Sequence, residues 1–226
     1  MGRFGAPLSF VLTVYAVPVS LYCAKLRILL RHKRLQWREI PPNGGYGSEA
    51  YRAIVPSGNL PALVDGDLLL ADSEAIAEYL NEKYRDPPML PDSIVGRARA
   101  RERSRFHDTR LEPSVRVLFP YLTVEPPDQD VFDRQAAVIT ARLAQFARLI
   151  ADDRNDPAVL ALGDCGYPIT FQWIAALNEI MELGSVWPDA VLAYAVKVRS
   201  HAAVASELAA YRPVLAEWLK TRGIKR

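Results

Sequence analysis

The chain of 226 residues is long enough for one large domain or two small ones, and either would bury a substantial core. Half of its residues are hydrophobic, 24% are charged and the formal net charge is +2, so we expect neither a nucleic acid nor a membrane as partner. Two cysteines are too few for a disulfide framework, and no zinc-type spacing occurs. We therefore expect a cytoplasmic protein without a metal.

The N-terminal part of the chain predicts a strand followed by a helix. Residues 9–16 (SFVLTVYA) are rich in β-branched and aromatic side chains, which is typical of a strand. Residues 21–33 carry apolar side chains at helical spacing. Because Pro18 and Ser20 break the apolar run, and a charged helical pattern follows at once, we do not expect a secretory leader.

A second strand, a short helix, a hairpin and a longer helix follow. Residues 35–42 (LQWREIPP) form a strand pattern that two prolines end, and residues 48–55 can supply the short helix. Asp65-Gly66 joins two apolar runs, which is a strong hairpin signal. Residues 72–84 are an amphipathic helix pattern. The order β-α-β-α-β-β-α predicts a mixed four-stranded sheet with helices on both faces.

The second half of the chain predicts helices only. Residues 85–93 (RDPPMLPDS) contain three prolines, and beyond them the strand signal disappears. The first long helix should be kinked where Pro113 removes a backbone donor. We therefore expect a first domain at residues 1–86, a linker at 87–93 and an all-helical domain at 94–226.

One stretch of the sequence carries a family resemblance. Residues 55–84 (VPSGNLPALVDGDLLLADSEAIAEYLNEKY) resemble the pattern NPxGKVPxLxDGxxxLxESxAIxxYL of cytosolic glutathione S-transferases. Residues 18–30 (PVSLYCAKLRILL) resemble the first active-site turn of that family, and the second half matches more loosely. The resemblance implies a thioredoxin-like N-terminal domain, an all-helical C-terminal domain, glutathione as co-substrate and a homodimer.

The resemblance implies that Ser20 is the catalytic residue. Counted back from Lys25-Leu26-Arg27, Ser20 falls where the serine-type transferases keep the serine that donates a hydrogen bond to the glutathione thiolate. The residue types fit that chemistry, because the positive end of a helix favours a sulfur anion. From the residues alone, Ser20 can also be a plain helix N-cap, a role that is compatible with catalysis.

The resemblance also implies a glutathione-binding set. Pro61 would be the cis-proline of the family, which presents the backbone of Leu60 to the cysteinyl part of glutathione. Asp72 and Ser73 would hold the γ-glutamyl end at a helix N-terminus, although helix capping alone is the alternative. Asn59 stands where relatives often carry a basic residue or Gln, so we expect weaker capture of the glycyl carboxylate.

The pocket for the electrophile should lie between the loop before Ser20 and the first long helix of the second half. Cys23 takes the place of the resolving cysteine of redox relatives and is either redox-active or inert through burial. His107 is either a polar wall residue or a core or surface histidine. The candidate lining residues by helical position are Val17, Arg103, Phe106, Arg110 and Phe119.

We predict from these residues a glutathione transferase that acts on small, largely apolar electrophiles. A zeta-like glutathione-dependent cis–trans isomerase is one alternative, although Leu21 and Tyr22 do not reproduce the zeta signature. A non-catalytic glutathione-binding or scaffold protein is another, which Asn59 leaves open. A thiol-disulfide oxidoreductase acting through Cys23 is disfavoured because Ser20 replaces the attacking position.

Overall fold

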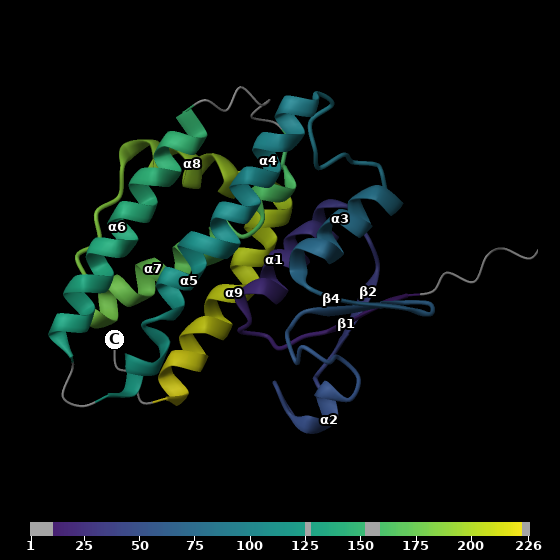
Figure 1. Cartoon of the computed structure of the whole chain (residues 1–226), viewed down its shortest axis with the longest axis horizontal. Coiled ribbons are helices and arrows are strands. Elements are labelled where there is room, and N and C mark those ends of the chain that lie inside the picture. Colours follow the sequence, from purple (N-terminus) through teal and green to yellow (C-terminus); the bar gives the residue numbers. More distant parts are fainter. Residues whose placement is uncertain (1–10, 125–127, 152–158, 223–226) are drawn as a thin grey trace, which may run out of the picture.

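The computed structural model describes residues 11–124, 128–151 and 159–222. It contains a small sheet with three helices and, beside it, a helical domain (Figure 1). The mixed sheet followed by an all-helical domain confirms the fold class predicted from the sequence. The expected first strand began at Ser9, but Ser9 and Phe10 lie outside the described residues.

The sheet has the strand order β2-β1-β3-β4. Strand β1 (Leu12–Tyr15) is parallel to β2 (Trp37–Ile40) and antiparallel to β3 (Ala62–Asp65). Strand β4 (Leu68–Ala71) completes the expected hairpin with β3. Gly66 makes its two-residue turn at φ +61°, a conformation that glycine adopts without steric cost.

Three helices accompany the sheet. Helix α1 (Leu21–His32) and helix α3 (Ser73–Lys83) lie together on one side of it, and the short helix α2 (Glu49–Arg52) lies on the other (Figure 1). Helix α1 is deeply buried because it lies between the sheet and helices of the second domain. The fold therefore places the N-terminus of α1 at the boundary between the two domains.

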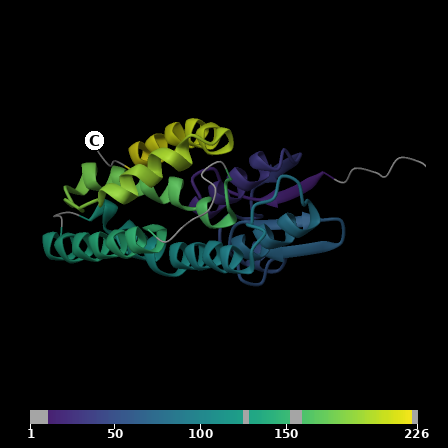
Figure 2. The same cartoon turned by 90° about the horizontal axis from the view of Figure 1, so that it is seen from above.

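The helical domain is built around one buried helix. Figure 2 shows α4 and α6 on one side of the molecule and α9 on the other, with α7 between them. Within the described residues, no helix is long and apolar enough to cross a bilayer. The helices of this domain are α4 (Ile94–Phe106), α5 (Glu112–Arg116), α6 (Gln129–Ala151), α7 (Tyr167–Met181), α8 (Asp189–Arg199) and α9 (Ala202–Thr221).

The expected irregularity at Pro113 is present. A turn of π-helix, η1 (His107–Leu111), separates α4 from α5. Pro113 has no N–H for the carbonyl of Thr109, and its ring crowds that carbonyl, so the regular hydrogen bond cannot form. The Thr109 carbonyl instead accepts a hydrogen bond of 3.4 Å from the guanidinium of Arg110.

Candidate active site

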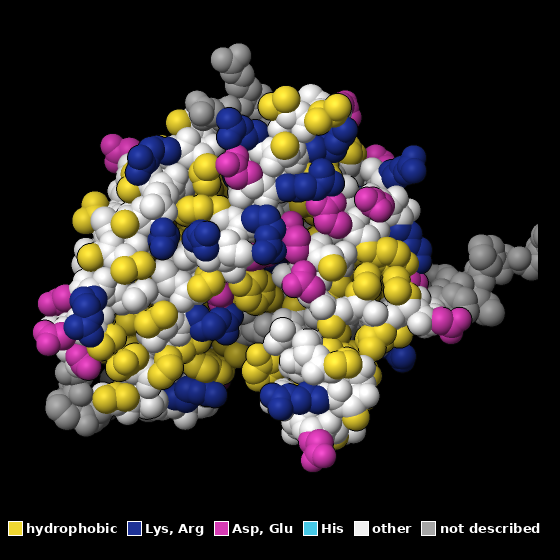
Figure 3. Space-filling model, viewed as in Figure 1, with side chains coloured by type: hydrophobic (Ala, Val, Ile, Leu, Met, Phe, Trp, Pro, Cys, Tyr) yellow, Lys and Arg dark blue, Asp and Glu magenta, His cyan; other side chains and the backbone are white. Residues whose placement is uncertain are grey.

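A cavity of about 880 Å³ lies between the two domains. Figure 3 shows the molecule hollowed between the lobe that carries α2 and the ends of α5 and α9. The cavity collects side chains that are far apart in the sequence, from the loop before α1 to the end of α9. The sequence-predicted residues that line it are Val17, Ser20, Asn59, Leu60, Asp72, Ser73 and Phe119.

Ser20 caps helix α1 and faces the cavity. Its backbone is extended, with φ −64° and ψ 123°, and its Oγ accepts a hydrogen bond of 3.3 Å from the backbone N–H of Cys23. Because the oxygen accepts this bond, the hydroxyl hydrogen is left to donate to a group in the cavity. Capping and donation are therefore compatible roles for the same hydroxyl.

A second helix N-terminus opens into the same cavity. Asp72 caps α3, and its carboxylate accepts hydrogen bonds of 2.9 Å and 3.0 Å from the backbone N–H groups of Glu74 and Ala75. Ser73, the first residue of the helix, is buried at the wall. The positive ends of two helices thus converge on one space, an arrangement that suits an anionic ligand.

The segment before β3 forms the wall between these two helix ends. The peptide bond between Leu60 and Pro61 is cis, as the resemblance implied. Leu60 lines the cavity, whereas Pro61 is buried and lies outside its wall. The hydroxyl of Tyr51 fixes this segment by donating a hydrogen bond of 2.9 Å to the backbone carbonyl of Asn59.

The far side of the cavity is aromatic. The rings of Phe119 and Trp173 lie 4.5 Å apart between centroids, and Trp218 packs edge-on against Trp173 at 5.5 Å. The guanidinium of Arg116 lies 5.7 Å from the Tyr22 ring and 5.6 Å from the Phe119 ring. The sequence reasoning missed Arg116 and both tryptophans, because α5, α7 and α9 meet here only through tertiary packing.

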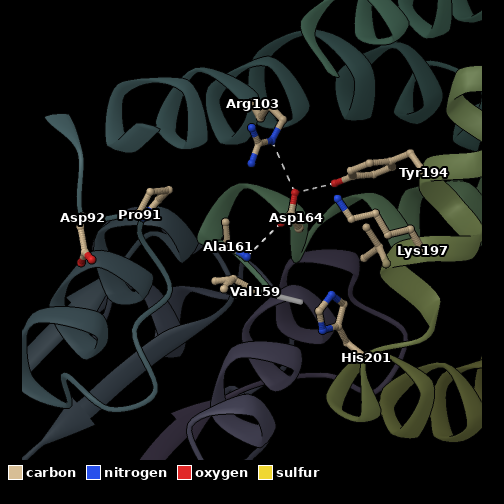
Figure 4. Close-up of a pocket in the computed structure, with 10 residues that line it drawn as sticks. Pro91, Asp92, Arg103, Val159, Ala161, Asp164, Tyr194, Lys197 and His201 are labelled. Atoms are coloured by element: carbon tan, nitrogen blue, oxygen red, sulfur yellow. Dashed lines mark hydrogen bonds and ion pairs between the residues drawn. The ribbon is translucent and has the colours of Figure 1, made fainter. Parts of the chain in front are cut away.

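Three candidate lining residues lie elsewhere. Arg103 is buried and points away from this cavity toward Asp164, with 3.4 Å between its Nε and the carboxylate, at a second cavity of about 220 Å³ (Figure 4). Phe106 stacks on Phe146 inside the helical domain, with 6.3 Å between centroids. Arg110 is exposed and does not line the cavity. Helical spacing selected the wrong positions, because the residues of α4 and the π-helical turn that line the cavity are Arg105, Asp108 and Thr109.

The two remaining candidates, Cys23 and His107, are core residues. Cys23 is 1% exposed, and burial raises the pKa of its thiol against the lowering effect of its contacts with Ser20 and Arg27. His107 is 1% exposed, and its two ring nitrogens lie 2.7 Å from Asp108 Oδ1 and 2.7 Å from Thr170 Oγ1. In the part of the chain that the structure describes, no three His, Cys, Asp or Glu side chains are grouped to hold a metal ion.

A buried charge network lies beneath the cavity. The ammonium of Lys25, whose side chain is 3% exposed, contacts Glu74 at 2.7 Å and Asp108 at 2.8 Å. Burial alone would lower the pKa of Lys25, but the charges of Asp108 and Glu74 outweigh it and raise that pKa. Next to this network, the Tyr22 hydroxyl donates a hydrogen bond of 3.0 Å to Glu112. The network therefore ties α1 to α3 and to the helical domain.

Comparisons with known proteins relate the first part of the chain to glutathione S-transferases. Residues 14–88 match the family model described as "Glutathione S-transferase, N-terminal domain". Glutathione S-transferase Z2 of Arabidopsis thaliana is 40% identical over 101 residues, which cover 40% of this chain and 45% of that protein. A stringent starvation protein A homolog of Coxiella burnetii is 34% identical over 107 residues, which cover 45% of this chain and 51% of that protein.

A solved structure extends the similarity to the second domain. The holo structure of maleyl pyruvate isomerase, a bacterial zeta-class glutathione S-transferase, superposes with a TM-score of 0.71 at 22% identity and covers 89% of this chain and 98% of that one. A thioredoxin-like domain joined to a helical domain is thus the fold that the two proteins share. Residues 14–88 are therefore a glutathione S-transferase N-terminal domain, and the chain as a whole shares the fold of solved glutathione transferases. The sequence matches span about half the length of each of these curated relatives.

Proposed function

We propose that this protein is a glutathione transferase that conjugates the thiolate of glutathione to small, largely apolar electrophiles. The observation that carries the proposal is the place of Ser20, a helix N-cap that lines a cavity of about 880 Å³. A hydroxyl donor and a helix N-terminus both favour a thiolate over a thiol. Each unit by which they lower the thiol pKa corresponds to about 1.4 kcal/mol, which is within reach of two such groups.

The proposed glutathione site extends from the N-terminus of α1 to the N-terminus of α3. Leu60 would pair its backbone with the cysteinyl part of glutathione, and Asp72 and Ser73 would hold the γ-glutamyl end at the N-terminus of α3. Asn59 would face the glycyl end, where it supplies hydrogen bonds and no charge. The aromatic wall of Phe119, Trp173 and Trp218 supports an apolar electrophile.

A zeta-like glutathione-dependent isomerase is the second candidate. The relative from Arabidopsis is named glutathione S-transferase Z2, and the maleyl pyruvate isomerase structure shares the fold. The isomerase would use the same glutathione site and a different electrophile. The similarity to a stringent starvation protein A homolog keeps a non-catalytic binding role as a third candidate. We also propose a homodimer in the cytoplasm, as is typical of the family.

The test is a titration of the ultraviolet thiolate absorbance of bound glutathione, with wild type and Ser20→Ala compared. We expect both proteins to bind glutathione and only wild type to lower the thiol pKa. Turnover of an aryl halide then separates conjugation from isomerisation, which is assayed with a maleyl compound. If glutathione does not bind to wild type at all, the binding and catalytic proposals both fail. Equal thiol pKa values in the two proteins would remove Ser20 from the catalytic role.

A further inference from the structure

The loop that presents Ser20 is held by hydrogen bonds to each of its backbone carbonyls. The Tyr211 hydroxyl of α9 donates a hydrogen bond of 2.7 Å to the carbonyl of Val19. Arg27 donates hydrogen bonds of 3.3 Å and 3.2 Å to the carbonyls of Val17 and Pro18. The bond from Tyr211 joins the two domains, because α9 belongs to the helical domain and Val19 to the thioredoxin-like one.

The bond from Tyr211 acts directly on the peptide group of Ser20. The Val19 carbonyl and the Ser20 N–H belong to one planar unit, so a fixed carbonyl also fixes the start of Ser20. The other end of this unit is fixed as well, since the Ser20 N–H donates a hydrogen bond of 3.2 Å to the Val17 carbonyl. With both ends of the peptide group bonded, the direction of the Ser20 side chain has little freedom.

Tyr211 is itself tied to the wall of the electrophile pocket. Its hydroxyl oxygen accepts a hydrogen bond of 2.8 Å from the indole N–H of Trp173. Tyr211 is 1% exposed and Trp173 is 2% exposed, so water does not compete for these bonds. A continuous chain of hydrogen bonds therefore leads from Trp173 through Tyr211 and Val19 to Ser20.

A second residue of α9, Glu207, also contributes to holding the loop, through Arg27. Glu207 lies one turn before Tyr211, is 1% exposed, and has its carboxylate 3.6 Å from Arg27 and 2.9 Å from Arg31. Arg27 is thus held between Glu207 and Glu39, which contacts it at 2.7 Å, while it donates to the loop carbonyls. Helix α9 therefore reaches the loop directly through Tyr211 and indirectly through Arg27.

We propose that Tyr211 is a positioning residue that sets the orientation of the Ser20 hydroxyl and couples it to the aromatic wall of the electrophile pocket through Trp173. Tyr211 is buried and does not line the cavity, so its effect passes through the Val19–Ser20 peptide group. The catalytic consequence rests on the proposed role of Ser20, whereas the ordering of the loop does not.

The test compares two Tyr→Phe substitutions, each of which removes a buried hydroxyl group. Tyr211→Phe removes the hydroxyl that reaches Val19, and Tyr194→Phe removes a buried hydroxyl that donates a hydrogen bond of 2.7 Å to Asp164, away from the loop. Tyr194→Phe deletes one buried hydrogen bond, and Tyr211→Phe deletes two, the bond to Val19 and the bond from Trp173, so both variants are expected to be less stable than wild type and Tyr211→Phe the less stable of the two. A change that Tyr211→Phe shows in the loop, and not in the rest of the described chain, is then specific to the loop.

Amide hydrogen exchange of the segment 17–23 without ligand is the first measurement. We expect Tyr211→Phe to speed exchange in this segment about tenfold, and Tyr194→Phe to leave it unchanged. Equal exchange in the two variants would overturn the proposal, whatever the protein catalyses. If Tyr211→Phe does not fold, Trp173→Phe removes the donor to Tyr211 and is expected to speed exchange in the same segment to a smaller extent. Unchanged exchange in that variant would overturn the coupling to the pocket wall.

The thiol pKa of bound glutathione is the second measurement. We expect Tyr211→Phe to raise this pKa and to lower kcat/KM near neutral pH by about threefold to tenfold, with most of the loss recovered at high pH. Tyr194→Phe should keep the wild-type pH profile. Faster exchange with an unchanged thiol pKa would overturn the catalytic part of the proposal. A wild-type protein that fails to bind glutathione would overturn the proposed function, and the exchange comparison would still decide the role of Tyr211 in the loop.

Discussion

Lys25 and Asp108 form an ion pair of 2.8 Å across the boundary between the two domains. Lys25 comes from α1 and Asp108 from the π-helical turn after α4, and both side chains are nearly excluded from solvent. Asp108 also lines the cavity, so the pair is both an interdomain contact and part of the cavity floor.

The first prediction concerns the removal of Lys25. Lys25→Met leaves the carboxylates of Glu74 and Asp108, whose side chains are 13% and 10% exposed, without their shared cation, so we expect a loss of about 3 kcal/mol in the free energy of unfolding. Lys220→Met is the matched control, because the pair between Lys220 and Glu217 is solvent-exposed and contributes little. Urea unfolding of both variants measures the difference. Similar midpoints would show that the buried network does not stabilise the fold.

The second prediction concerns acid. Burial favours the neutral form of Asp108, but the hydrogen bond from His107 and the charge of Lys25 outweigh it and lower the pKa to about 2, from the usual 3.8. Because the pKa is lowered in the fold, the stabilisation is complete above the usual value and is lost as the pH falls toward the lowered one. It amounts to roughly 2 kcal/mol.

Asp108→Asn tests the acid prediction. We expect this variant to be less stable than wild type at neutral pH and to lose less stability between about pH 4 and pH 2. Asp133→Asn, an exposed aspartate on α6, serves as the control and should keep the wild-type pH dependence. An Asp108→Asn curve parallel to that of wild type over this range would contradict the assignment.

The third prediction separates capping from ligand binding at Asp72. Asn caps helices about as well as Asp, so Asp72→Asn should keep the stability of wild type, whereas Asp72→Ala should lose about 1 kcal/mol. If the carboxylate also binds the ammonium of glutathione, both variants lose roughly tenfold in affinity. Calorimetric titration with glutathione and thermal unfolding measure the two effects. Full affinity in Asp72→Asn would reduce Asp72 to a cap.

The fourth prediction concerns Cys23. Because burial raises the pKa of this thiol and leaves it 1% exposed, we expect it to resist aromatic disulfide reagents until the protein unfolds. Cys23→Ala should retain transferase turnover, since Ser20 and not Cys23 faces the cavity. Fast labelling of the native protein at Cys23, or loss of activity in the variant, would contradict this prediction and favour a thiol-disulfide oxidoreductase that acts through Cys23.

Local patterns in the sequence were sufficient for the element order and for the helix starts that line the cavity. The spacing of apolar residues gave the strands and helices, and Asp65-Gly66 gave the hairpin, because such signals depend on residues that are close in the chain. Ser20, Asp72 and Ser73 were predicted at helix starts, where the structure has them. These positions follow from capping, which is also a local interaction.

Only the tertiary structure decided which helical residues reach the cavity. Helical spacing selected Arg103, Phe106 and Arg110, but Arg103 and Phe106 pack inside the helical domain and Arg110 lies outside the cavity. Trp173 and Trp218 line the cavity because α7 and α9 cross beside the loop before α1, and that loop is held by a residue 192 positions later in the chain. The amino-acid sequence by itself determined the elements and their caps, since these form between neighbours. Packing between distant segments determined the electrophile wall and the hydrogen bonds that hold Ser20.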